Sequence, residues 1–183
     1  MIKINSTNYI IIILLISAIA RLFAALYFAD KDLVNEWAVL VHNLDFSGTL
    51  GYHVISSQLN IIPKFAEPGE TVLPSVFMPP LYAYFIYSIK VLSPNFVNYV
   101  TLIIAIQIII SLISIYIFYK ILKNFYSINT TLISTVVFSL IPLNVYSSVQ
   151  VSSISLQIFL LVFYFYFVFN FSETNKIKHL IFF

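Results

Sequence analysis

Long apolar segments alternate with one long polar segment along this chain. The apolar segments are each about 20 residues long, enough to cross roughly 30 Å of hydrocarbon as a helix. They cover residues 9–29, 97–119, 128–147 and 152–171. We therefore expect an all-α integral membrane protein with about four transmembrane helices, arranged as a single membrane domain over residues 1–183.

The first apolar segment has two possible interpretations. Ser17-Ala18-Ile19-Ala20 is similar to a small-residue cleavage site, so a signal peptide is the alternative to a transmembrane helix. The apolar stretch continues for two turns past Arg21, which a cleaved segment would not need, and this favours the helix. Arg21 then lies within a span, where it either extends toward the interface or faces the interior of the bundle. An interior guanidinium would meet Glu36 or a bound phosphate.

The polar segment, residues 30–95, predicts two short helices that lie in the membrane interface. Residues 33–46 have helical spacing, with Leu33, Trp37, Leu40 and Leu44 on one face and Glu36 and Asn43 on or near another. Pro79-Pro80 suits the start of a second helix over residues 81–92. The intervening residues 52–76 read as an irregular loop that could hold a short strand pair.

Charge placement decides how this polar segment lies relative to the membrane. Residues 81–92 either cross the membrane or lie in the interface. In the second arrangement all the lysines outside the polar segment share one side, opposite the acids, as the positive-inside rule favours. These lysines are Lys3, Lys120, Lys123, Lys176 and Lys178. We therefore expect a cytoplasmic N-terminus, an extracytoplasmic segment 30–95, and a location in the bacterial inner membrane.

The last residues, 179–183, read as the opening of a further span that is cut short. We therefore expect this sequence to be the N-terminal portion of a longer membrane protein.

Composition narrows the function classes. The chain is 61% hydrophobic and 9% charged, which is typical of membrane proteins. It has no Lys/Arg run for nucleic acid, no cysteine for a thiolate site, and three glycines, too few for a glycine-rich phosphate loop. Six of its seven acids lie between residues 30 and 80, so we expect the water-facing chemistry there.

Two stretches of this segment resemble a known family. Asn35-Glu36-Trp37-Ala38-Val39-Leu40-Val41-His42-Asn43-Leu44 and Phe77-Met78-Pro79-Pro80-Leu81-Tyr82-Ala83-Tyr84 look like the N-terminal part of the GT-C membrane glycosyltransferases. The nearest group would be the RgtA/B/C/D-like and dolichyl-phosphate-mannose-protein mannosyltransferases. The resemblance covers nearly all of this chain, but about the first third of a full-length family member.

The resemblance implies transfer of a sugar from a polyprenyl-phosphate donor to a glycan, lipid or protein acceptor outside the membrane. By position, Glu36 would be the acid that the family uses near the acceptor or a divalent metal ion. Where family members often carry a second acid, this chain has Gln150, Ser152 and Ser153. That difference favours the alternative function of a non-catalytic membrane subunit, or of a lipid or polysaccharide transport component.

The chemistry of sugar transfer needs a base for the acceptor hydroxyl and a cation for the leaving phosphate. Glu36 is the candidate base, and Arg21 and then Lys64 are the favoured phosphate partners, from a set that also includes Lys31 and Lys90. Glu36 and His53 are weak candidates for a metal site. The candidate residues of the substrate cleft are His42, Asn43, Pro79, Pro80, Tyr82, Gln150 and Ser152.

Overall fold

A computed structural model of the chain describes residues 6–33, 35–53, 72–74, 79–94 and 96–173. The chain divides into two compact units, one formed by residues 1–29 with 104–183 and the other by residues 30–103. The first boundary follows directly after the first apolar segment. The second falls inside the next long helix, so the helical unit and the loop unit are described separately below.

Helices dominate the described part of both units, as the sequence predicts. The helical unit holds α1 (Ser6–Phe28), α4 (Tyr99–Phe125, whose first residues belong to the other unit), α5 (Ile128–Leu140), α6 (Pro142–Ser147) and α7 (Ile154–Glu173). Two helices, Asn8–Phe28 and α4, are long and apolar enough to cross a membrane. Two others, Ile128–Leu140 and Ile154–Asn170, are apolar but shorter, so the four expected transmembrane helices stay a prediction.

The segment expected as one helix over residues 128–147 is two helices instead, because it breaks at Pro142. The proline ring disfavours the α conformation for the preceding residue, and Ile141 is accordingly extended, with φ −53° and ψ 125°. Proline also has no N–H to donate to the carbonyl of Phe138, four residues earlier. The side-chain amide of Asn144 donates to that oxygen at 2.8 Å and so replaces the missing backbone bond.

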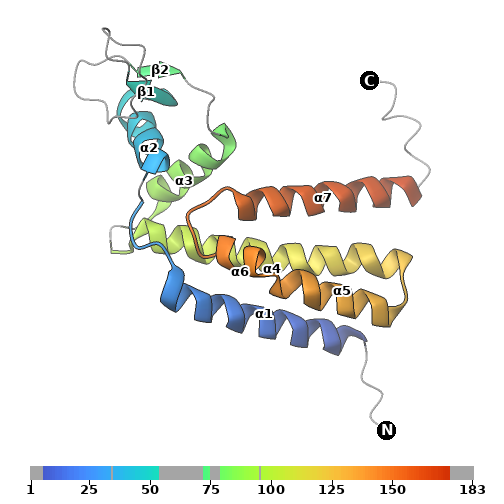
Figure 1. Cartoon of the computed structure of the whole chain (residues 1–183). Helices are drawn as coiled ribbons and strands as arrows, with labels where there is room; N and C mark the ends of the chain where they lie inside the picture. The colour runs from blue at the N-terminus through green and yellow to red at the C-terminus, as the bar shows by residue number, and fades with distance from the viewer. Residues whose placement is uncertain (1–5, 34, 54–71, 75–78, 95, 174–183) are drawn as a thin grey trace. The chain divides into compact units, whose positions relative to one another are not determined.

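Helices α1 and α5 bury polar residues and expose many large apolar ones. In α1 the buried positions Ser17 and Arg21 alternate at helical spacing with large exposed side chains such as Leu22, which is 58% exposed. The buried positions of α5 are all hydroxyl residues, Thr131, Thr135 and Ser139. In Figure 1, α1 runs alongside α5 and α6, and contacts between these helices confirm it. A water-soluble bundle would show the opposite distribution.

Aromatic and aliphatic side chains hold the ends of this bundle together. Ile10 and Ile13 of α1 pack with Tyr119 of α4. Phe118 of α4 stacks on Phe138 of α5 with ring centroids 4.3 Å apart. Because the start of α1 contacts the end of α4, the two helices run antiparallel.

The loop unit contains two short helices and a small sheet. The helices are α2 (Asn35–Ser47) and α3 (Pro80–Leu92), close to the predicted ranges, and each is too short to span a membrane. The strands β1 (Gly51–His53) and β2 (Val72–Pro74) pair antiparallel, with Tyr52 opposite Leu73. Gly48, with φ +69°, ends α2 in the left-handed conformation that favours glycine. Residues 179–183 lie outside the described residues.

Candidate functional site

Helices α2 and α3 pack against each other at their first turns. The ring of Trp37 on α2 meets the ring of Tyr82 on α3 edge to face, with centroids 4.7 Å apart. Val39, Leu40 and Ala83 form a buried cluster behind these rings. Since Glu36 directly precedes Trp37, this packing brings the first turn of α2 next to the start of α3.

The candidate residues around this contact have different exposures. Pro79 and Pro80 are exposed at the start of α3, whereas Tyr82 is buried at 1% exposure. The side chain of Glu36 lies outside the described residues. Its backbone is in the first helical turn of α2, and the backbone of Pro80 opens α3, so the two stretches that carry the family resemblance meet in one unit.

His42 and Asn43 have structural contacts on the same helix. His42 is half-buried and stacks on Phe46, with the ring planes 2° apart. Asn43 is completely buried, and its amide donates to the backbone oxygen of Gly51 at 3.0 Å. Asn43 was expected on the polar face, but it fastens α2 to β1 from the inside of the loop unit.

The cations and metal candidates of the loop unit are partly described. Lys90 pairs with Asp45 at 2.7 Å in an exposed ion pair, which contributes little stability. Lys64 and the side chain of His53 lie outside the described residues. Among the described residues, no group of three or more His, Cys, Asp or Glu side chains is placed to hold a metal ion.

Arg21 lies at the centre of the helical unit and is 0% exposed. Its Nε donates to Ser111 Oγ on α4 at 2.9 Å. Its Nη1 donates to the carbonyl of Ser139 on α5 at 3.1 Å, and to both the carbonyl and the hydroxyl of Ser17. Nη2 has no hydrogen-bond partner in the described part of the chain. Of its two interpretations, the structure favours a guanidinium that faces the bundle interior.

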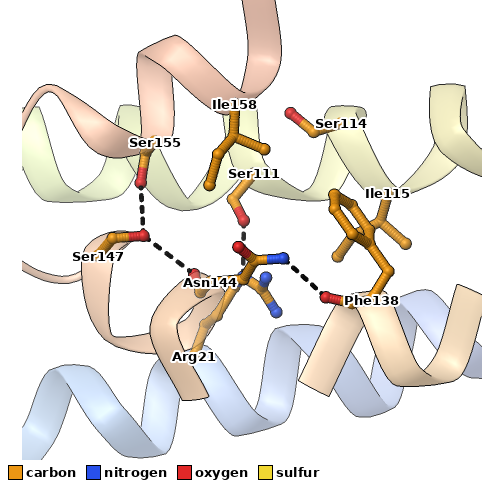
Figure 2. A pocket seen from close by; sticks show the side chains of 9 residues that line it. All are labelled: Arg21, Ser111, Ser114, Ile115, Phe138, Asn144, Ser147, Ser155 and Ile158. Carbon is orange, nitrogen blue, oxygen red and sulfur yellow. Dashed lines mark hydrogen bonds between the residues drawn. The ribbon is translucent and has the colours of Figure 1, made fainter. Parts of the chain in front are cut away.

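A small cavity lies beside Arg21 (Figure 2). The volume that the centre of a water molecule can occupy in it is about 10 Å³, which is room for about one water. Its lining is rich in hydroxyl and amide groups from three helices, α4, α6 and α7. The lining residues are Arg21, Ser111, Ser114, Ile115, Phe138, Asn144, Ser147, Ser155 and Ile158.

The cavity donors come from segments far apart in the sequence. Figure 2 shows Ser155 of α7, Ser147 and Asn144 of α6, and Ser111 of α4 arranged around Arg21 of α1. No Asp or Glu is present among the described side chains of this helical unit. The cavity therefore combines a buried cation with several hydrogen-bond donors and has no described carboxylate to neutralise it.

Gln150 and Ser152, two candidates for the substrate cleft, make hydrogen bonds within the helical unit. The amide of Gln150 donates to the carbonyl of Phe28 at the end of α1. The hydroxyl of Ser152 accepts from the backbone N–H of Ile154 at 3.2 Å, as a helix-capping group does, and its carbonyl accepts from Gln107 at 2.9 Å. Neither residue lines the cavity beside Arg21.

Sequence reasoning selected Arg21 but missed the residues that surround it and line the cavity. Ser111, Asn144, Ser147 and Ser155 looked like ordinary polar interruptions of apolar segments. A usable signal was present in α1, where Ser17 and Arg21 are four residues apart and share one face of an otherwise apolar helix. The polar residues of the other apolar segments are candidates for the same buried interior.

Comparison with known proteins adds no relative to this picture: no family model, no curated protein and no solved structure matches the chain.

Proposed function

We propose that this chain is embedded in a membrane through its helical unit. The buried polar faces and exposed apolar faces of α1 and α5 support this, because lipid is the solvent that favours such a distribution. Small hydroxyl residues at helix contacts are also typical of membrane bundles. The bacterial inner membrane, with residues 30–95 outside, is the location that charge placement favours.

In this setting the chain acts as a membrane glycosyltransferase, or as the N-terminal part of one, on a polyprenyl-phosphate sugar donor. The observation that carries the proposal is the packing of Trp37 against Tyr82, which joins the Glu36 turn to the double-proline start of α3. Both stretches that resemble the GT-C enzymes thus contribute to one surface of the loop unit. Without that contact the resemblance would rest on two unconnected stretches.

Each group has a defined role in this reaction. The carboxylate of Glu36 takes the proton from the acceptor hydroxyl as that oxygen attacks the sugar carbon, and the bond to the donor phosphate breaks. A cation stabilises the leaving phosphate. Of the two candidates Lys64 is preferred, because Nε and Nη1 of Arg21 already donate within the helical unit and the cavity beside Arg21 has room for about one water. A divalent metal ion near Glu36 could serve the same purpose.

The test is sugar transfer by membranes that contain the full chain, assayed with a panel of labelled polyprenyl-phosphate sugars. Glu36→Gln should reduce transfer by about 10²–10⁴-fold, the usual contribution of a general base. Asp45→Asn is the matched control, because Asp45 is an exposed acid on the same helix. Full turnover by Glu36→Gln would remove Glu36 from the mechanism.

A second candidate function is that of a non-catalytic membrane subunit. It is favoured by the structural hydrogen bonds of Gln150 and Ser152, which lie where family members often carry a second acid. In that case the wild-type chain transfers no sugar from any donor in the panel, and Glu36→Gln has no effect on its function in cells.

A further inference from the structure

The cavity beside Arg21 leads to an inference that does not depend on sugar transfer. A guanidinium with 0% exposure inside an apolar bundle is costly unless an opposite charge neutralises it. The described residues of the helical unit accept hydrogen bonds from Arg21 through Ser111 Oγ and the carbonyl of Ser139, but none of their described side chains is a carboxylate. A bound anion in the cavity can supply the charge that the described side chains of this unit do not.

The lining groups still have protons to donate. Ser111 Oγ accepts from Arg21 Nε, so its own proton can point elsewhere. The hydroxyls of Ser147 and Ser155 are 3.5 Å apart, at the limit of a hydrogen bond, and the contact of Ser147 with the carbonyl of Asn144 is equally long. Asn144 uses one amide N–H on Phe138 and keeps the second.

Size and charge define the ligand. Room for about one water excludes a sugar phosphate in this conformation. One guanidinium charge is neutralised by one negative charge, and a divalent anion would leave a net charge in the apolar interior. A phosphate is best held by two guanidinium nitrogens in parallel, but Arg21 has a single nitrogen without a partner among the described residues.

We propose that the cavity lined by Arg21, Ser111, Asn144, Ser147 and Ser155 is a binding site for one small monovalent inorganic anion such as chloride. Arg21 Nη2 and the lining hydroxyls donate hydrogen bonds to the anion. The bound anion joins α1, α4, α6 and α7 and stabilises the helical unit. Such binding leaves the donor phosphate to Lys64 in the proposed transfer reaction.

The experiment uses the full chain purified in detergent. Chloride replaces gluconate, a larger anion, in steps at constant ionic strength. Chloride binding is followed by the width of the chloride NMR line, and stability by thermal unfolding. We expect saturable broadening and a higher melting temperature in chloride, both lost in Arg21→Gln. If chloride changes neither the line width nor the melting temperature of the wild-type chain, the proposal is overturned, because water would then be the occupant.

A second variant and a competition experiment test the proposal independently of Arg21→Gln. If Arg21→Gln does not fold, Ser147→Ala with Ser155→Ala should still fold and bind chloride about tenfold more weakly, equivalent to about 1.4 kcal/mol. Ser148→Ala is the matched control, since this buried hydroxyl donates to Val145 and does not line the cavity. Displacement of chloride by polyprenyl phosphate but not by inorganic phosphate would identify the donor lipid as the ligand and overturn the proposal.

Discussion

Arg21 shows how a charged side chain is accommodated in a bundle of apolar helices. It is buried among hydroxyls and carbonyls that come from three helices, and its four hydrogen bonds to described residues involve only Nε and Nη1. Hydrogen bonds to a charged group are worth more than neutral ones, and a buried charged donor without a partner is costly. Each partner of Arg21 should therefore matter individually to stability.

Replacing Ser111 should destabilise the protein more than replacing its neighbour Ser114. Ser111→Ala leaves Arg21 Nε without its acceptor, so we expect a loss of about 1–3 kcal/mol in the free energy of unfolding. Ser114 is also buried on α4 and lines the same cavity, but its hydroxyl only donates to Ile110 of its own helix. Ser114→Ala should cost less than about 0.5 kcal/mol.

Unfolding of both variants in detergent, followed by circular dichroism, measures the difference. Equal stability of the two variants would mean that Arg21 finds another acceptor for Nε.

At the scale of elements, the break between α5 and α6 creates the cavity's polar wall. Pro142 ends α5 and turns the chain so that α6 presents Asn144 and Ser147 toward the helices around Arg21. The amide of Asn144 completes the break, because it donates to the carbonyl of Phe138 that the proline leaves without a backbone donor. A broken helix at membrane depth is tolerated where neighbouring groups satisfy its backbone in this way.

The role of Asn144 depends on Pro142, and a double-mutant cycle can measure that dependence. Asn144→Ala alone should cost about 1–3 kcal/mol, because the Phe138 carbonyl loses its donor. In a Pro142→Ala background residue 142 regains an N–H, and Asn144→Ala should cost markedly less there. Thermal unfolding of the four proteins gives the coupling energy, and additive effects would contradict the assigned role.

For the whole molecule, the division into two units follows the division of the sequence into apolar and polar parts. The loop unit begins at Asp30, where the first apolar segment ends, and its helices are each too short to span a bilayer. The helical unit carries the two helices that are long and apolar enough to do so. In the proposed membrane setting, lipid covers its exposed apolar faces.

Single cysteines can test both the embedding and the orientation, since the chain has no cysteine of its own. Lys31→Cys should react with an impermeant maleimide in intact cells, and Lys123→Cys only after the cells are permeabilised. Leu22→Cys should react in neither case, although Leu22 is 58% exposed in the chain, because lipid covers it. Reaction of Leu22→Cys would contradict the embedding, and a reversed lysine pattern would contradict the orientation.

Much of the local structure could be predicted from the sequence, and the candidate site only in part. The ranges of α1, α2, α3 and α7 followed from apolar periodicity and from proline and glycine, while α4 ends six residues later than expected. Periodicity shows that a face is polar but not which other polar face it meets. For this reason Arg21 was identified from its position in a span, and its serine partners were not.

The sequence by itself determined the alternation of apolar helices with one polar segment, and the breaks at Gly48 and Pro80, because these depend on local conformation and on hydropathy. Only the tertiary structure decided that Asn43 is buried, that Trp37 meets Tyr82, and which groups surround Arg21. Those outcomes depend on how helices distant in the sequence pack, since each buried polar group must find its partner across that packing.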